Sequence, residues 1–260
     1  MRWQTLRHGV TGYQLASYGF TIVMLPINVI AFFPLYTPYC SIAIVVIYVY
    51  VYCIVIYLTF RDSCLEELMD KTRYENFVRQ PFNQEGGRHV IENMYCNICC
   101  LYVEKETKHC KRCNYCVKKF DHHCVWLNNC IGSVNYKMFV LLVASICFSS
   151  LLSICMCGMS ILNWFSDQSL NYILHFDLAT SNETFRYIWL LCCVLCVMVY
   201  VVSFSTTAHL LWFHIKLLKA GMTTYKFIVS KGRAKVAVMQ VSQTQTEPNP
   251  YEVVNTANPV

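Results

Sequence analysis

The sequence has 260 residues, of which 56% are hydrophobic, 14% are charged and 17 are cysteines. Soluble domains carry roughly 25% charged residues, so the low charged fraction disfavours an ordinary soluble domain. The high hydrophobic content excludes a disordered or collagen-like chain, and the length of the chain disfavours a short secreted disulfide scaffold. The formal net charge is a modest +6. Length, composition and charge together predict a polytopic membrane protein.

Four apolar stretches that lack Asp, Glu, Lys and Arg are long enough to cross a bilayer, which takes about 20 residues. They cover residues 13–33, 39–60, 138–165 and 187–215. The first two are separated only by residues 34–38 and are expected to form a transmembrane helical hairpin. The predicted fold class is an all-α polytopic membrane protein with four transmembrane helices.

Basic residues are distributed unevenly among the segments that connect these spans. Twelve of the 21 Lys and Arg residues lie in residues 61–137, six lie in 216–260 and two in 1–12. The positive-inside rule therefore predicts that these three segments are cytosolic and that residues 166–186 are lumenal. We expect a multi-pass protein of the endoplasmic reticulum, Golgi or endosome, with both termini in the cytosol.

Three smaller features complete this topology. Residues 61–137 hold 12 basic and 10 acidic side chains, so they form no polyanion-binding stripe and no nucleic-acid partner is expected. Asn182 starts an N-x-[ST] sequon in the predicted lumenal segment, too close to the fourth span for efficient glycosylation. The tail is polar and Gln-rich from Arg233 onward, and its distal part is expected to be disordered.

The cysteines between Cys96 and Cys130 have a regular spacing, with a core at residues 94–137. Disulfides are a poor explanation in a reducing cytosolic segment. Thiolates two residues apart can hold one side of a tetrahedral zinc ion, and a structural site takes four nitrogen or sulfur ligands. Interleaved use of these residues predicts two structural Zn²⁺ sites: Cys96, Cys99, His109 and Cys116 in one, and Cys110, Cys113, His123 and Cys130 in the other.

Cys124 stays outside both predicted ligand sets, as does Cys100, which we interpret as a bystander. His122, two residues before Cys124, can take the thiol proton, and Asp121 can hold the imidazole in the required tautomer. These residue types predict an activated thiolate. The alternative is that Cys124 is a spare or exchangeable metal ligand.

The order and spacing from Cys96 to Cys130, continued by Asn135-x3-Phe139, resemble the DHHC-type (Asp-His-His-Cys) protein S-acyltransferases, the palmitoyltransferases. Four spans with a cysteine-rich domain between the second and third are also the layout of that family. The resemblance covers residues 10–230 approximately.

The resemblance implies a two-step reaction. Cys124 attacks a fatty acyl-CoA, most often palmitoyl-CoA, and a cysteine of a substrate protein then takes the acyl group from the enzyme thioester. His122 is implied to be the general base, Asp121 its orienting partner and His123 a zinc ligand. The implied partners are acyl-CoA, the lipid bilayer, and cytosolic or membrane proteins with membrane-proximal cysteines.

The resemblance also assigns three supporting residues. It places Trp126 near the entrance of an acyl-chain cavity and lets Thr224 support Asp121. Asn135 is expected to be a support or substrate-binding residue. Outside this set, His209 and His214 of the fourth span are interpreted as packing or interface residues rather than as a proton relay.

The chain departs from the family pattern at four places. Val125 replaces the usual proline, and residues 104–108 replace a proline- and arginine-containing sequence. Asp62-Ser63-Cys64 replaces the usual Asp-Pro-Gly, and Thr-Thr-x-Glu reads Thr-Thr-Tyr-Lys, with Lys226 last. The departures spare the tetrad and the ligands, so reduced activity is compatible with them.

Val125 and Lys226 favour one alternative function, a zinc-stabilised membrane adaptor with weak or no acyltransferase activity. A RING-type ubiquitin ligase fits poorly, because the long gap between its second and third ligand pairs is missing and Asp121 and Cys124 would have no task.

Overall fold

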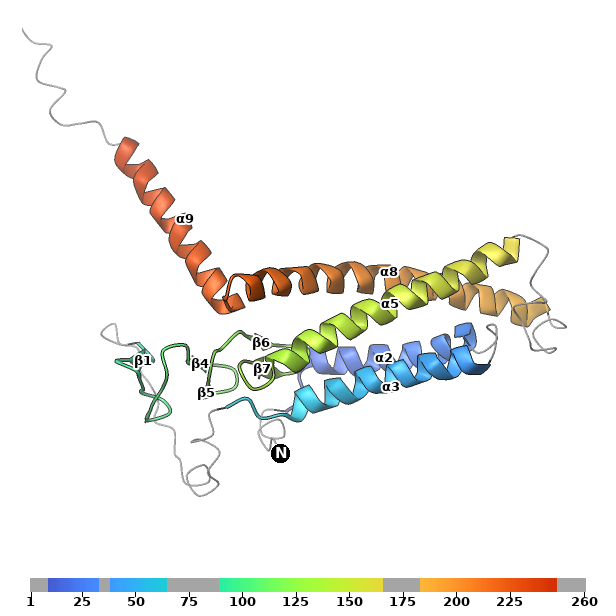
Figure 1. Cartoon of the computed structure of the whole chain (residues 1–260), viewed down its shortest axis with the longest axis horizontal. Helices are drawn as coiled ribbons and strands as arrows, with labels where there is room; N and C mark the ends of the chain where they lie inside the picture. Colours follow the sequence, from blue (N-terminus) through green and yellow to red (C-terminus); the bar gives the residue numbers. More distant parts are fainter. Residues whose placement is uncertain (1–8, 33–37, 65–88, 166–182, 247–260) are drawn as a thin grey trace, which may run out of the picture.

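The computed structural model describes residues 9–32, 38–64, 89–165 and 183–246, which form a helical bundle, a small cysteine-rich domain and a projecting helix (Figure 1). The bundle consists of four long helices: α2 (Gly12–Phe32), α3 (Pro38–Phe60), α5 (Tyr136–Phe165) and α8 (Glu183–Lys219). All four are long and apolar enough to cross a membrane. The prediction of four helices of transmembrane length is therefore confirmed.

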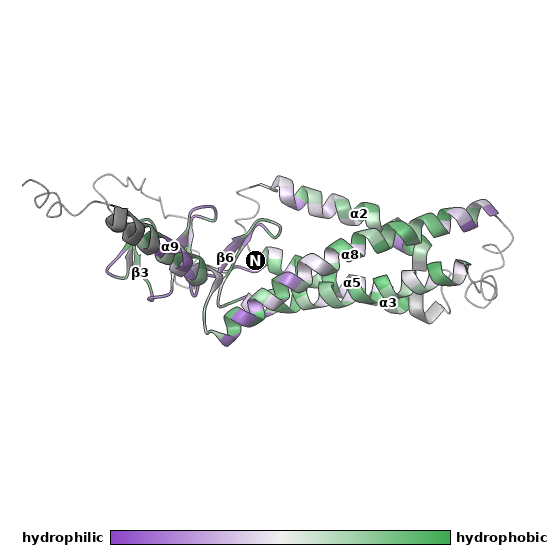
Figure 2. Cartoon of the chain, turned by 90° about the horizontal axis from the view of Figure 1, so that it is seen from above, coloured by the Kyte–Doolittle hydropathy of each residue, from purple (hydrophilic) through white to green (hydrophobic). Residues whose placement is uncertain are grey.

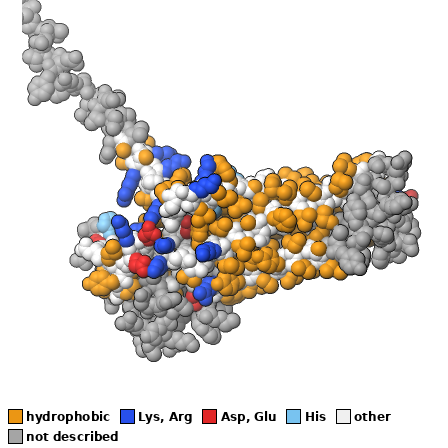
Figure 3. Space-filling view, viewed as in Figure 1, with side chains coloured by type: hydrophobic (Ala, Val, Ile, Leu, Met, Phe, Trp, Pro, Cys, Tyr) orange, Lys and Arg blue, Asp and Glu red, His pale blue; other side chains and the backbone are white. Residues whose placement is uncertain are grey.

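Apolar side chains cover the outside of the bundle as well as its interior. Val46, Leu191 and Met198 are among the large hydrophobic residues that the bundle exposes. Figure 2 shows that the helices are hydrophobic over most of their length, and Figure 3 shows that charged side chains gather at the end that carries the cysteine-rich domain. Helices that are apolar on all sides are stable in hydrocarbon rather than in water.

Helix α8 is longer than a bilayer requires. Its 37 residues, at about 1.5 Å each, span roughly 55 Å, whereas a hydrocarbon core is roughly 30 Å thick. The last turn carries Lys216 and Lys219. The helix therefore extends beyond the predicted span 187–215 toward the cysteine-rich domain, packing along α5 for much of its length.

Hydrogen bonds between buried polar side chains set the rotation of the helices within the bundle. The Tyr200 hydroxyl of α8 donates to Asn28 Oδ1 of α2 at 2.6 Å, and Trp189 Nε1 donates to the Ala31 carbonyl at 3.2 Å. The hydroxyls of Ser150 in α5 and Ser203 in α8 are 2.9 Å apart. Because an unpaired polar group costs free energy in an apolar interior, these bonds favour one rotation of α2, α5 and α8.

The cysteine-rich domain, residues 89–135, follows α3 and consists of short antiparallel hairpins. One sheet has the order β1-β2-β3, and two further pairs are β4-β5 and β6-β7. Their bounds are β1 Ile91–Glu92, β2 Tyr95–Cys96, β3 Leu101–Tyr102, β4 Lys108–Cys110, β5 Tyr115–Val117, β6 His122–Cys124 and β7 Asn129–Ile131. The fold is thus mostly helical rather than all-α. Two- and three-residue strands are too short to bury an apolar face, so the hairpins need other contacts for stability.

Asn129 joins the cysteine-rich domain to the end of α3. Its Nδ2 donates to the Leu58 carbonyl at 2.7 Å and to the Arg61 carbonyl at 2.8 Å. Its Oδ1 accepts the Cys130 N–H at 2.8 Å and the Ser63 hydroxyl at 3.1 Å. The last carbonyls of a helix lack partners within it, so this fully buried amide satisfies the end of α3 and attaches the domain at the same time.

A further helix, α9 (Thr224–Thr246), follows α8 and projects away from the bundle (Figure 1). Disorder was expected from Arg233 onward, but the helix continues to Thr246. Residues 233–240 consist of Arg, Ala, Lys, Val, Met and Gln, several of which are strong helix formers, and this local propensity explains the difference.

Several predicted features lie outside the described residues. They are the first part of the N-terminus (1–8), the hairpin connection (33–37), part of the central segment (65–88), the predicted lumenal segment with Asn182 (166–182) and the end of the tail (247–260).

The contacts of Asn129 predict that Asn129→Ala lowers the free energy of unfolding by about 1–3 kcal/mol, because the buried Leu58 carbonyl and the part-buried Arg61 carbonyl lose their donor. Asn97→Ala is the matched control, since Asn97 makes one exposed bond to the His89 carbonyl at 3.1 Å, and it should cost less than about 1 kcal/mol. Thermal unfolding of the purified protein in detergent measures both. Equal losses in the two variants would contradict the anchoring role.

Candidate metal and thiol centre

The first Cys/His group forms where β2 and the β4–β5 hairpin meet. The β4–β5 register places His109 opposite Cys116. His109 Nδ1 lies 3.3 Å from Cys99 Sγ, 3.7 Å from Cys96 Sγ and 3.9 Å from Cys116 Sγ. The four ligand atoms all lie within 4.8 Å of one another. Zn–S bonds of about 2.3 Å and a Zn–N bond of about 2.0 Å need ligand atoms this close, so the group has the size of a tetrahedral zinc site.

The second group is built by the β6–β7 hairpin, whose register places His123 opposite Cys130. His123 Nδ1 lies 3.2 Å from Cys113 Sγ, 3.6 Å from Cys130 Sγ and 3.7 Å from Cys110 Sγ. The Cys130 and Cys113 sulfur atoms are 3.3 Å apart. The structure therefore brings together both sets of four residues that the spacing predicts as ligands, and Cys100 lies exposed outside them.

The thiols within each group are electrostatically coupled. Hydrogen bonds from neighbouring thiols hold the pKa of Cys96 and of Cys110 well below its ordinary value. The thiols that share a proton with them, Cys116 and Cys130, have a raised pKa. A bound cation would stabilise the further thiolates that metal ligation requires.

The side chains of strand β6 lie on two opposite faces, one toward the second Cys/His group and one away from it. Successive residues of a strand point to opposite faces, so His123 faces the second ligand group whereas His122 and Cys124 face away from it. Cys124 is 8% exposed and packs among apolar side chains at the end of the bundle, including Leu58 and Phe139. The thiol therefore lies at the junction between the cysteine-rich domain and the membrane helices.

Cys124, His122 and Asp121 form a chain of polar contacts. His122 Nδ1 donates to Asp121 Oδ2 at 2.7 Å, and the Cys124 thiol lies near enough to the imidazole to help raise its pKa. Burial by itself would lower the pKa of His122, but the bonds to Asp121 and Cys124 outweigh it and raise this pKa to about 9. For Asp121 the directions are reversed: burial alone would raise its pKa, but its hydrogen bonds to His122 and Thr224 outweigh burial and lower it. The carboxylate stays ionised, and the imidazole can hold a proton taken from the thiol.

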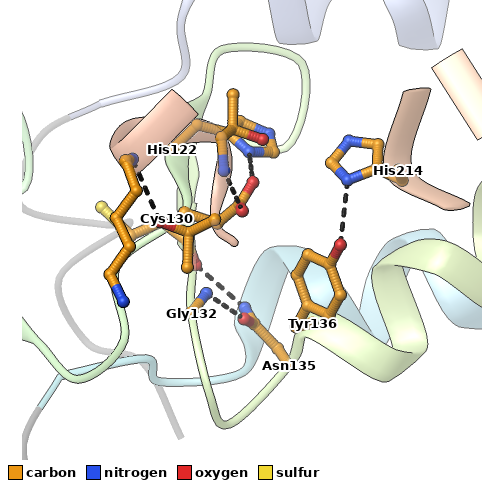
Figure 4. A network of polar contacts seen from close by, with 10 residues as sticks. His122, Cys130, Gly132, Asn135, Tyr136 and His214 are labelled. Carbon is orange, nitrogen blue, oxygen red and sulfur yellow. Dashed lines mark hydrogen bonds and ion pairs between the residues drawn. The ribbon is translucent and has the colours of Figure 1, made fainter. Parts of the chain in front are cut away.

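The start of α9 supplies the second contact to Asp121. The Thr224 N–H donates to Asp121 Oδ1 at 2.8 Å, and Figure 4 shows this region. Thr223 caps the helix, since its hydroxyl accepts the Lys226 N–H at 3.3 Å, and Thr224 is the first residue of α9. Free N–H groups at a helix N-terminus favour a negative charge. The structure thus places Thr224 against Asp121 through its backbone N–H.

Asn135 stabilises the turn between β7 and α5. Its Nδ2 donates to the Cys130 carbonyl at 2.9 Å, and its Oδ1 accepts the Gly132 N–H at 3.0 Å (Figure 4). A Cβ at Gly132 would lie 2.5 Å from a Val117 methyl and 2.8 Å from the Lys118 carbonyl oxygen, so only glycine fits there. The structure makes Asn135 a support residue for a ligand-bearing turn.

Trp126 lies near the surface beside the start of α2. It is 55% exposed, and its ring meets the Tyr13 ring edge-on at 5.5 Å between centroids. The Asn128 side chain donates to the Gly9 carbonyl at 3.3 Å, and the Thr11 hydroxyl donates to the Val125 carbonyl at 3.5 Å. The loop that follows Cys124 is therefore tied to the N-terminal end of the bundle.

His214 lies beside the thiol site, and no sequence pattern predicted this placement. It is 2% exposed, its Nδ1 lies 3.1 Å from the Tyr136 hydroxyl (Figure 4), and its ring centroid is 6.3 Å from that of His122. Phe139 meets both rings edge-on. His214 does pack as expected, but its neighbour is His122. An ionisable residue inside a membrane helix was the available signal.

Comparisons with known proteins agree with this geometry. Residues 89–231 match the family model described as DHHC palmitoyltransferase. The chain is 36% identical to Palmitoyltransferase ZDHHC1 of Mus musculus over 170 residues, and 37% identical to Palmitoyltransferase ZDHHC1 of Homo sapiens over 162 residues. These alignments cover 60% and 57% of this chain, and 35% and 33% of the two relatives. The aligned part of the chain thus spans about a third of the length of the curated relatives.

Proposed function

The chain belongs to the DHHC palmitoyltransferase family, and on that premise we propose that it is a protein S-acyltransferase. It transfers palmitate or a similar fatty acyl group from acyl-CoA to cysteines of substrate proteins at the cytosolic face of a membrane. The observation that carries this proposal is the hydrogen bond from His122 to Asp121 beside the buried Cys124 thiol, on the face of β6 opposite the second Cys/His group.

In the first step His122 takes the Cys124 proton and the thiolate attacks the acyl-CoA carbonyl. The thioester bond to CoA breaks, the acyl–Cys124 bond forms, and the CoA thiolate takes the proton from His122. In the second step His122 takes the proton of a substrate cysteine, whose thiolate attacks the acyl-enzyme. The acyl–Cys124 bond breaks, a thioester to the substrate cysteine forms, and the released Cys124 thiolate takes the proton from His122. Asp121 stays ionised and holds the ring so that its other nitrogen faces the sulfur.

The position of Cys124 suits a substrate that is half lipid. Its apolar neighbours include Ile54, Leu58 and Leu142 of the bundle, so an acyl chain on the sulfur can enter hydrocarbon while CoA stays in water. Burial of a chain contributes about 0.8 kcal/mol per methylene. The charged side chains that gather around the cysteine-rich domain fit a cytosolic position at this end (Figure 3). Proteins with membrane-proximal cysteines are the substrates that can reach this thiol.

Two structural Zn²⁺ ions are the metals that the two ligand groups fit best, since each offers three thiolates and one imidazole in a reducing compartment. Bound zinc supplies rigidity rather than chemistry at this site. Cys130 and His123 would hold β7 against β6, and that pairing positions Cys124. Endomembrane localisation with cytosolic termini remains part of the proposal.

The two departures that favour the adaptor alternative, Lys226 and Val125, lie close to the proposed reacting groups without separating them. Lys226, the basic residue that favoured it, does not displace Thr224 from Asp121. Val125 lies in the loop bound to Thr11, next to an intact contact chain. The departures from the family pattern therefore leave the reacting groups in place.

Cys124→Ser should abolish labelling by a clickable palmitoyl-CoA analogue, because the serine hydroxyl is a far weaker nucleophile, while bound zinc stays near two ions per chain. In-gel fluorescence and zinc analysis of purified protein measure the two quantities. Labelling that survives this change and is removed by neutral hydroxylamine, which cleaves a thioester but spares a serine ester, would assign the nucleophile to another cysteine.

Removing one ligand tests the zinc assignment. Cys113→Ser should lower bound zinc by about one ion per chain and destabilise the β6–β7 hairpin, because a structural site needs four ligands. Cys100→Ser is the matched control, since its exposed sulfur lies outside both groups, and it should keep both ions. Metal analysis by mass spectrometry decides between one and two ions.

The contact between Thr224 and Asp121 predicts different effects for two substitutions at one position. Thr224→Pro removes the N–H at the first position of a helix, where proline is well tolerated, and should slow acyl-enzyme formation about tenfold or more. Thr224→Ala keeps that N–H and should retain most of the rate. If alanine were as harmful as proline, the side chain rather than the backbone would be the supporting group.

A further inference from the structure

Lys226 makes a charged contact that connects α9 to the cysteine-rich domain. Its Nζ forms an ion pair with Glu106 Oε1, and both side chains are about 40% exposed, at 41% and 37%. One residue earlier, the Tyr225 ring meets the Phe120 ring edge-on with 5.8 Å between centroids. Lys108 Nζ lies 5.3 Å from the centroid of the Tyr225 ring. The first turn of α9 is thus fastened to residues 106–120.

A lysine at this position of a helix is electrostatically unfavourable. The N-terminus of a helix carries a partial positive charge, and Lys226 lies within the first turn of α9. A threonine cap is commonly completed by Glu or Gln three residues later, whose side chain accepts the N–H of the cap residue. Here Thr223 is the cap and Lys226 takes the place of that acceptor.

Glu106 brings a carboxylate to the same place from a distant part of the sequence. The two partners are 120 residues apart. They also belong to two of the segments where the chain departs from the family pattern, residues 104–108 and the end of Thr-Thr-Tyr-Lys. The two departures meet in space, and their charges are opposite.

We propose that Glu106 and Lys226 are a positioning pair in which Glu106 supplies the negative charge that the first turn of α9 lacks. The pair holds α9 so that the Thr224 N–H stays on Asp121. Neither residue touches the reacting atoms; both act through Thr224. The catalytic part of this inference rests on the proposed acyltransferase function.

Glu106→Lys places two like charges at the contact and removes the carboxylate from the end of α9. Single-turnover acyl-enzyme formation at saturating palmitoyl-CoA should slow by about threefold to tenfold, the range expected when a partly exposed ion pair becomes a repulsive one. The concentration of palmitoyl-CoA at half saturation and the zinc content should not change.

The charge-swapped double variant Glu106→Lys/Lys226→Glu should return the rate to within about twofold of the original, because it restores both the pair and a carboxylate at the cap. Glu104→Lys is the matched control. It reverses a charge two residues away, where Glu104 pairs with Lys118 at 2.5 Å, and should leave the rate unchanged. A swap that fails to restore the rate, or a control that slows it equally, overturns the proposal.

Salt separates this electrostatic role from a general loss of structure. Raising NaCl from 0.1 to 0.5 M, which shortens the Debye length from about 10 Å to roughly 4 Å, should slow the original protein and speed the Glu106→Lys variant. Purely structural damage would not invert the sign of the salt effect, so an unchanged sign counts against the pair.

Hydrogen exchange tests the positioning without any activity. The peptide that contains the Thr224 amide should exchange faster in Glu106→Lys and return to the original rate in the charge-swapped variant. If the original protein forms no acyl-enzyme at all, the proposed function fails while this exchange result still decides whether the pair holds α9. Equal exchange in all variants overturns the positioning role.

Discussion

The pairing of β6 with β7 is the constraint on which the site depends. His123 and Cys130 lie opposite each other in this pair and belong to the second ligand group. The residues on either side of Cys130 do other work: Asn129 binds the end of α3, and the Ile131 carbonyl accepts the Asp121 N–H at 2.9 Å. A slip of β6 by one residue would exchange the two faces of that strand, so His123 would turn away from the Cys/His group and Cys124 would turn toward it.

Two forces therefore hold Cys124 at the membrane junction. The ligand group anchors one face of the hairpin, and apolar packing against α3 and α5 holds the other. Both supports are needed in this interpretation, because three-residue strands bury too little surface to be stable alone. A metal ion bound by the second group would therefore stabilise the same geometry as packing against the helices, and loss of either support is expected to disturb the position of Cys124 relative to His122.

The start of α9 provides a second, independent support for the same carboxylate. Asp121 receives one hydrogen bond from His122 and another from the Thr224 N–H, which lies more than a hundred positions later in the chain. The helix N-terminus stabilises the ionised carboxylate, and the Glu106–Lys226 pair keeps that terminus against the domain. Lys226 departs from the family pattern, and its partner Glu106 lies in residues 104–108, which also depart from that pattern.

The four long helices and the two Cys/His groups could be predicted from local sequence patterns. About twenty apolar residues without a charge have few alternatives to a membrane helix, and thiol and imidazole spacing reflects the small radius of a metal site. The same spacing leaves Cys124 outside both predicted sets. Three contacts between distant segments could be seen only in the folded chain. They are the placement of His214 beside His122, the anchoring by Asn129, and the pairing of Glu106 with Lys226. No local pattern specifies these, because the rotation of α8 and the docking of α9 are set by packing across the whole molecule.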